Sequence, residues 1–176
     1  MDPCCDCDMT NWHGSFEDRH AEVEVTIVDA EELGGTMMKK LAELFEDDAA
    51  DDFDWQVWDR HFALHVKAPA LLARRMAAAL PEEEDGLVVN VIDQRVWRLT
   101  PKFFSYTLSK SALWTATRTM AQAYAPDIRV NAIGPGPTLA NERQTQEDFA
   151  RQVEGLILRR GPALAEFGAT IRYLWQ

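Results

Sequence analysis

The sequence has few basic residues and no long apolar run, and each shortage argues against a class of protein. Lys and Arg total 18 against 29 Asp and Glu, which gives a formal net charge of -11. This balance argues against nucleic-acid binding, because neutralising phosphates needs clustered Lys and Arg. No apolar run reaches the about 18 residues of a membrane span, and the acidic N-terminus lacks the apolar segment of a secretory signal. We therefore expect a soluble, cytoplasmic protein that binds neither nucleic acid nor membrane.

Cysteine is also scarce, and its placement favours neither a disulfide framework nor a metal site. The chain has three cysteines, all near the N-terminus, at Cys4, Cys5 and Cys7. An odd number of thiols argues against a disulfide framework. Even with His13 and His20 nearby, the spacing matches no standard zinc pattern, and adjacent cysteines do not easily ligate one ion. We expect no metal site, and a disordered leader over the polar residues 1–20.

Beyond the leader, patterns of strand and helix alternate over residues 21–176, a length that suits a single domain. Alternating or Val-rich apolar patterns predict strands at 21–29, 86–93 and 128–133. Apolar residues at helical spacing predict helices at 30–45, 55–80 (with a kink at Pro69), 105–125, 146–156 and 163–174. The acidic segment 46–54 is interpreted as a solvated linker. Alternating strands and helices predict an α/β domain with a parallel sheet.

A tyrosine and a lysine lie four residues apart in Tyr106-Thr-Leu-Ser-Lys110, at the start of an expected helix. Residues at this spacing share one helix face, so the ammonium lies near the phenol. A nearby positive charge stabilises the phenolate and lowers the pKa of a tyrosine from its reference value of about 10. The phenol can then donate a proton to a carbonyl or imine that is being reduced.

The surroundings of this motif resemble the short-chain dehydrogenase/reductase family over residues 45–174. The motif follows a buried-type strand and precedes RVNAIGPGPT, which is similar to the family's strand and loop beside the nicotinamide. Asp93 lies thirteen residues before Tyr106, where most members carry a catalytic serine. An Asp there is typical of the pteridine reductases and the related dihydromonapterin and dihydrofolate reductases. In HVKAP, His65 stands where the family usually has Asn.

This resemblance implies a Rossmann-like doubly wound parallel sheet and NADPH-dependent reduction of a pterin or dihydrofolate-type substrate. Tyr106 would donate the proton, and Lys110 would lower its pKa and bind the nicotinamide ribose. Asp93 would position or protonate the pteridine. Further candidate contacts of the NADP(H) cofactor are Pro135, Gly136 and Thr138. His65 is an additional candidate for the site.

Each of these residues also has a structural interpretation that needs no chemistry. Asp93 could simply end a strand, and Tyr106 could be an aromatic residue on a helix face. His65 could be a core histidine whose hydrogen bonds are satisfied. The joint spacing of Asp93, Tyr106 and Lys110 favours the catalytic interpretation for those three residues, whereas the two interpretations of His65 stay balanced.

The chain lacks the glycine-rich loop with which the family binds pyrophosphate at a helix N-terminus. Gly34 and Gly35 lie inside a helical pattern and are not preceded by the strand and turn that the loop requires. The family's last strand is not recognisable before Gln176 either. We therefore expect an incomplete sheet, as in a truncated or rearranged reductase, and weak NADPH binding at best.

Two functions follow from this combination. The first is an NADPH-dependent reductase, and the second is a catalytically inactive interaction protein that retains the family's helices. In the family, the helices that correspond to 55–80 and 104–125 pair across a dimer interface. We expect a homo-oligomer formed through them in either case, because a small sheet cannot cover their apolar faces.

Overall fold

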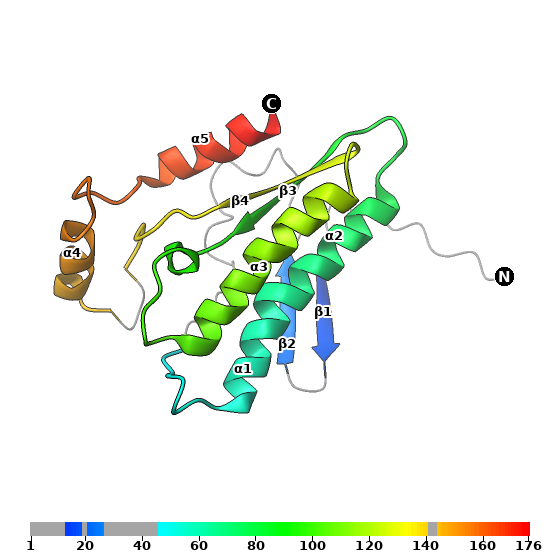
Figure 1. Cartoon of the computed structure of the whole chain (residues 1–176). Coiled ribbons are helices and arrows are strands. Elements are labelled where there is room, and N and C mark those ends of the chain that lie inside the picture. Colours follow the sequence, from blue (N-terminus) through cyan, green and yellow to red (C-terminus); the bar gives the residue numbers. More distant parts are fainter. Residues whose placement is uncertain (1–12, 19–20, 27–45, 141–143) are drawn as a thin grey trace.

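The computed structural model describes the backbone of residues 13–18, 21–26, 46–140 and 144–176 (Figure 1). In chain order the elements are β1 (His13–Asp18), β2 (Ala21–Thr26), α1 (Trp55–Phe62), the π-helical turn η4 (Ala63–Lys67), α2 (Ala68–Ala79), β3 (Gly86–Val91), the 3-10 turn η5 (Gln94–Val96), α3 (Phe104–Ala123), β4 (Ile128–Ile133), α4 (Gln146–Glu154) and α5 (Leu164–Trp175). Among the helices of these residues, none is both long and apolar enough to cross a membrane.

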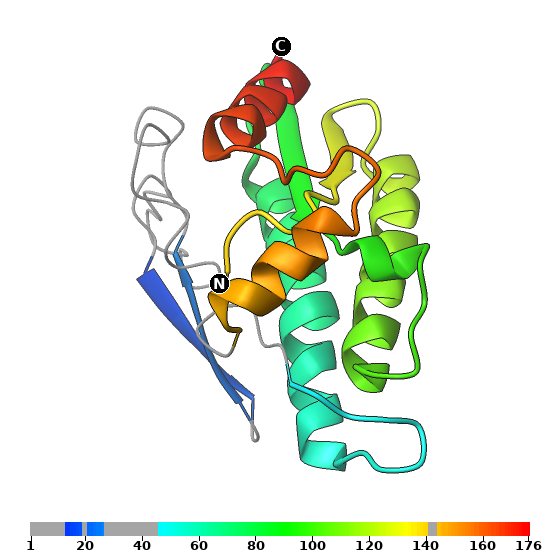
Figure 2. The same cartoon turned by 90° about the vertical axis from the view of Figure 1, so that its left-hand side faces the viewer.

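The strands β3 and β4 form a parallel pair joined by α3, which makes a β-α-β unit. Their register runs from Gly86 opposite Ile128 to Val91 opposite Ile133. Helices α2 and α3 pack side by side against this pair, and α5 lies on its other side (Figures 1 and 2). The chain is therefore an α/β protein with helices on both faces of a parallel sheet, which confirms the expected fold class.

The two faces of β4 carry different residues, and this alternation fixes which helix covers which face. Ile128 and Val130 are buried in a cluster with Ala73 of α2 and Met120 of α3. Arg129 points the other way and donates to the carbonyls of Leu174 and Trp175 at the end of α5, at 2.5 and 3.0 Å. Guanidinium donors satisfy carbonyls that a helix leaves unpaired at its C-terminus.

The hairpin of β1 and β2 differs from the sequence expectation. Residues 21–26 form a strand, but it pairs with β1 in an antiparallel two-stranded sheet and is separate from the β3–β4 pair. Residues 13–18, expected to lie in a disordered leader, supply its partner. Only two residues connect the strands, a length that lets neighbouring segments fold back on each other. The cysteine cluster and the expected helix 30–45 lie outside the described residues.

The expected helix 55–80 is interrupted by the π-helical turn Ala63–Lys67, which ends two residues before Pro69, the site of the predicted kink. Pro69 has no N–H to donate to the carbonyl four residues earlier, and its ring crowds that carbonyl. The backbone widens instead, and the N–H of Ala68 bonds to the carbonyl of Ala63, five residues before it. Proline thus changes the helix type over one turn, and the axis continues into α2.

The acidic segment 46–54 is structured and does more than link elements, contrary to its interpretation as a solvated linker. The carboxylate of Asp54 caps α1 by accepting from the N–H groups of Gln56 and Val57 at 2.6 and 3.3 Å. Ala49 forms an isolated bridge with Lys102, so the segment lies against the start of α3. Its carboxylates therefore serve as caps of helix N-termini, where a negative charge is stabilising.

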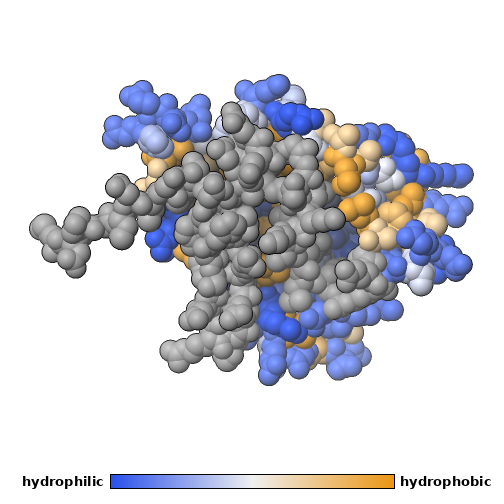
Figure 3. Space-filling view, turned by 180° about the vertical axis from the view of Figure 1, so that it is seen from behind, coloured by the Kyte–Doolittle hydropathy of each residue, from blue (hydrophilic) through white to orange (hydrophobic). Residues whose placement is uncertain are grey.

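Truncating the core should cost far more stability than the same truncation at the surface. Ile128 is 2% exposed, whereas Ile157, in the connection between α4 and α5, is fully exposed. Figure 3, seen from behind, shows that apolar patches do reach the surface of the molecule. We expect Ile128→Ala to lower the free energy of unfolding by about 2–5 kcal/mol, because it leaves a cavity beside Val130 and Met120. Ile157→Ala should change it by less than about 0.5 kcal/mol. Urea unfolding measures both, and equal losses would contradict the packing described.

Candidate active site

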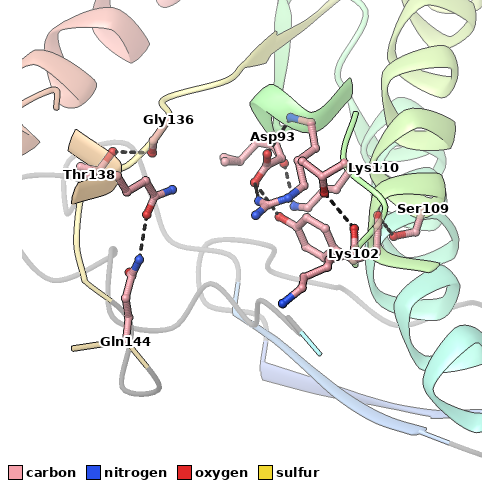
Figure 4. Close-up of polar contacts among 12 residues, drawn as sticks. Asp93, Lys102, Ser109, Lys110, Gly136, Thr138 and Gln144 are labelled. Carbon is pink, nitrogen blue, oxygen red and sulfur yellow. Dashed lines mark hydrogen bonds and ion pairs between the residues drawn. The ribbon is translucent and has the colours of Figure 1, made fainter. Parts of the chain in front are cut away.

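The candidate site lies at the carboxyl edge of the parallel pair. Because β3 and β4 run in the same direction, the segments that follow them leave the sheet at one edge. Asp93 follows β3, and the loop from Gly134 to Thr138 follows β4. Ligands of open α/β sheets bind at this edge. Figure 4 shows Asp93 close to Lys110, with Gly136 and Thr138 on a separate segment to one side.

The structure brings Asp93, Tyr106 and Lys110 together, as their spacing predicts. Tyr106 lies in the first turn of α3 with no exposed surface, and its hydroxyl donates to Asp93 Oδ2 at 3.1 Å. Lys110, one turn later, donates from Nζ to the carbonyl of Val91 at 3.1 Å and lies 5.6 Å from the centroid of the Tyr106 ring. A phenol is thus held between a carboxylate and an ammonium in a buried site.

Asp93 is oriented by Arg95, a residue that the sequence reasoning missed. The N–H of Arg95 donates to Asp93 Oδ1 at 2.8 Å, because Asp93 caps the short turn Gln94–Val96. The guanidinium of Arg95 lies 3.4 Å from Oδ2, the oxygen that also accepts from Tyr106. The carboxylate therefore has a fixed direction, with one oxygen aimed at the phenol. The sequence signal for this contact between Arg95 and Asp93 is an Asp two residues before an Arg, directly after a strand.

His65 lies beside Tyr106 and is held in one tautomer. Its Nδ1 is 2.8 Å from the hydroxyl of Ser109, and that hydroxyl donates its single proton to the carbonyl of Tyr106 at 2.7 Å. Nδ1 must therefore carry the hydrogen and donate it to Ser109. Burial, with Lys110 and His61 nearby, lowers the pKa of His65 to about 3, so the ring is neutral near pH 7. Its Nε2 is a buried acceptor with no hydrogen-bond partner among the described residues.

A second buried histidine was missed altogether. His61 lies one turn before His65, with ring centroids 5.6 Å apart, and its Nδ1 is 2.7 Å from the hydroxyl of Ser105. The hydroxyl of Ser105 in turn donates to the carboxylate of Asp48. Two His–Ser pairs thus link α1 and η4 to α3. The matching four-residue spacing of the two histidines and of the two serines was the available signal.

The loop after β4 is held in a shape that leaves its backbone accessible. Gly136 has φ +70°, which favours glycine, and a Cβ there would meet no atom within 4 Å. The hydroxyl of Thr138 donates to the Gly136 carbonyl at 3.2 Å. Gly161 lies so close that a Cβ on it would be 2.2 Å from the carbonyl oxygen of Pro137. The segment after α4 therefore packs directly against this loop.

These groups fit the nicotinamide end of a dinucleotide. Lys110 supplies a cation with hydrogens for ribose hydroxyls, Gly136 supplies bare backbone, and Thr138 supplies a hydroxyl, all at the ligand edge of the sheet. Pro135 lies on the same loop and is half-buried. Among the described residues we find no glycine-rich turn at a helix N-terminus for a pyrophosphate, so the fit covers one half of such a cofactor.

Comparison with known proteins identifies the family of the chain. The family model described as enoyl-(acyl carrier protein) reductase matches residues 26–176. Over 86 residues the chain is 37% identical to the human dehydrogenase/reductase SDR family member 4. The chain belongs to the short-chain dehydrogenase/reductase family. Within the family, the chain is 30% identical over 121 residues to the dihydromonapterin reductase of Klebsiella pneumoniae. The matched residues make up 68% of this chain and 50% of that reductase.

Among solved structures, this family member is similar to the alternative dihydrofolate reductase FolM of Brucella suis, crystallised with NADP. The identity is 66% and the TM-score 0.74, over 76% of this chain and 54% of that one. The chain therefore spans about half the length of the relatives that it matches. The expected resemblance to the dihydromonapterin and dihydrofolate reductase branch is confirmed.

The lowered pKa of His65 makes stability depend on pH with a definite sign. Its pKa is about 3 in the folded protein against 6.5 as the ordinary value, so the unfolded chain takes up the proton first as the pH falls. Stability from this group is complete above about pH 6.5 and is lost on acidification by at most about 1.4 kcal/mol per pH unit.

We therefore expect His65→Asn to reduce the stability lost between about pH 7 and about pH 5 by on the order of 2 kcal/mol, because the variant removes the buried base. Urea unfolding of both proteins at the two pH values measures this difference. An identical loss in the two proteins would show that His65 titrates normally.

Proposed function

We propose that the chain is the catalytic part of an NADPH-dependent reductase that acts on a pterin or dihydrofolate-type substrate in the cytoplasm. The observation that carries this is the buried Tyr106 hydroxyl, bonded to Asp93 at 3.1 Å with the Lys110 ammonium beside the same ring. The proposal is supported by the 66% identity to the alternative dihydrofolate reductase of Brucella suis, whose crystal contains NADP.

Tyr106 is the proton donor in this proposal. Lys110 favours the phenolate that forms when the proton leaves, and it also holds the ribose of the cofactor. Thr138 and the backbone of Gly136 contact the cofactor from the other side of the site. When bound, NADPH supplies the hydride. His65 and Ser109 pack beside the phenol and fix the turn that carries it, since Ser109 bonds to the carbonyl of Tyr106.

Asp93 favours a pteridine over a simple ketone as the substrate. A carboxylate accepts hydrogen bonds and does not donate them, so it suits the ring N–H and amino groups of a pterin. Such a donor on Asp93 would compete with the Tyr106 hydroxyl for Oδ2 and free the phenol hydrogen to turn toward the substrate's C=N bond. Arg95 keeps the carboxylate aimed at the site, because its backbone N–H and its guanidinium contact the two carboxylate oxygens.

Self-association through α1, α2 and α3 is a second part of the proposal. The end of this helix layer carries a cluster of five contacting aromatic rings: Phe53, Trp55, Trp58, Phe62 and Phe104. Trp55 in this cluster is 65% exposed, and Leu108 on α3 is 37% exposed. Apolar surface of this kind is typical of association sites. An interaction protein without catalytic activity would use the same surface, so activity measurements decide between the two functions.

Tyr106→Phe should abolish most of the reductase activity without harming the fold, because it keeps the ring and removes the transferable proton. With NADPH and dihydrofolate or dihydrobiopterin, we expect kcat to fall by about a hundredfold to ten-thousandfold. Tyr124→Phe, at the other end of α3, is the matched control and should retain the wild-type rate. NADPH consumption measures both, and a Tyr106→Phe variant that keeps most of the rate would refute the assignment.

Asp93→Ser should separate pterin reduction from carbonyl reduction. The hydroxyl of serine can donate to a carbonyl oxygen but cannot replace an ionic acceptor for pterin N–H groups. We expect kcat/KM for a pterin to fall more than kcat/KM for a simple ketone, by a factor on the order of ten or more. Equal losses for the two substrates would show that Asp93 does not select the pterin.

A further inference from the structure

We propose that Asp48, His61 and Ser105 form a positioning unit that fixes Tyr106 at the start of α3. The three act on the proposed reaction through the position of Tyr106, whose ring His61 meets edge-on. This inference rests on the proposed function for its kinetic consequence, while its structural consequence stands independently.

Asp48 caps the catalytic helix from a distant part of the chain. Its carbonyl accepts from the N–H of Phe103 at 2.8 Å and of Phe104 at 3.4 Å, and both carboxylate oxygens lie 3.2 Å from the N–H of Ser105. Phe103, which precedes the helix, makes no side-chain cap of its own and has φ +59°, a conformation that favours glycine. The start of α3 therefore depends on Asp48 for the partners that a local cap normally supplies.

Ser105 and His61 lock this cap in one arrangement. The hydroxyl of Ser105 donates to Asp48, so it must accept the hydrogen that His61 carries on Nδ1, 2.7 Å away. The other ring nitrogen of His61 then accepts from the N–H of Glu46 at 3.5 Å. His61 and Ser105 have no exposed surface, so water cannot replace these bonds. The four groups form one directed chain from segment 46–48 to α1 and α3.

The unit fixes the position of Tyr106, because Tyr106 is the next residue after Ser105. The Tyr106 ring stands edge-on to His61 and His65, with centroid distances of 5.8 and 5.3 Å. Asp93, which the phenol must reach, belongs to the segment after β3. The first turn of α3 thus sets the distance between two catalytic groups on different elements. A displacement of about 1 Å in such a geometry can cost on the order of a hundredfold in rate.

The kinetic test compares Asp48→Ala with its neighbour. Asp47 is exposed, so Asp47→Ala removes the same charge from the same segment and leaves the cap in place. We expect Asp48→Ala to lower kcat by about 10- to 100-fold with little change in KM, and Asp48→Asn, which keeps an acceptor oxygen, to recover most of that loss. Asp47→Ala should behave as wild type. A kcat loss shared by Asp47→Ala, or not recovered by Asn, would overturn the proposal.

A second measurement does not depend on activity and separates this inference from the proposed function. Thr117, farther along α3, also buries a hydroxyl that accepts a bond from another element, from Asn90 at 2.8 Å. In amide hydrogen exchange, Asp48→Ala and Ser105→Ala should raise the exchange rates of residues 104–106 by about tenfold or more relative to Thr117→Val. Unchanged exchange at these amides would refute the positioning unit, even if the wild type is an active reductase. Faster exchange at these amides in the two variants, together with a wild type that reduces no pterin, would support the positioning unit and refute the proposed reductase function.

Discussion

The parallel pairing of β3 with β4 is the constraint on which the site depends. It requires a crossover, and α3 supplies it, so the tyrosine and lysine of that helix lie across the edge where both strands end. Asp93 leaves β3 at this edge, and the Gly136 loop leaves β4 beside it. The bond from Lys110 to the carbonyl of Val91 then ties the crossover helix to the end of the strand. The parallel direction of the two strands thus brings Asp93, α3 and the Gly136 loop to the same edge of the sheet.

The helix layer adds a second level of positioning. Pro69 converts one turn of the chain between α1 and α2 into a π-helix, and His65 lies in that turn. A π-turn shifts the faces of the helix, and here both His61 and His65 meet serines of α3. The neutral, buried state of these histidines, whose pKa values burial lowers, suits a role in fixed hydrogen bonds more than a role in proton transfer.

Much of the site follows from local spacing in the sequence, and the remainder follows from contacts between distant segments. The four-residue interval from Tyr106 to Lys110 fixes their common face, and the strand that ends near Asp93 brings the carboxylate to the same edge. Pro69 marks where the long helix changes, although its effect on the backbone depends on packing against α3. The role of Asp48 is invisible in the sequence, because its partner Ser105 lies 57 residues later. The pairing of His13–Asp18 was missed because that segment has little apolar alternation.

Intrinsic fluorescence tests most directly whether Lys110 holds the nicotinamide end of NADPH, as proposed above. Trp97 follows the turn that carries Asp93 and contacts Trp114 of α3 at a centroid distance of 5.6 Å. The emission of these two of the six tryptophans therefore reports on this edge. We predict a saturable change on titration with NADPH, with a dissociation constant above about 1 µM, because the sequence has no glycine-rich loop to bind the pyrophosphate. Lys110→Met should weaken the binding further. Binding of equal strength to the wild type and to Lys110→Met, or no saturable change in the wild type, would contradict the account.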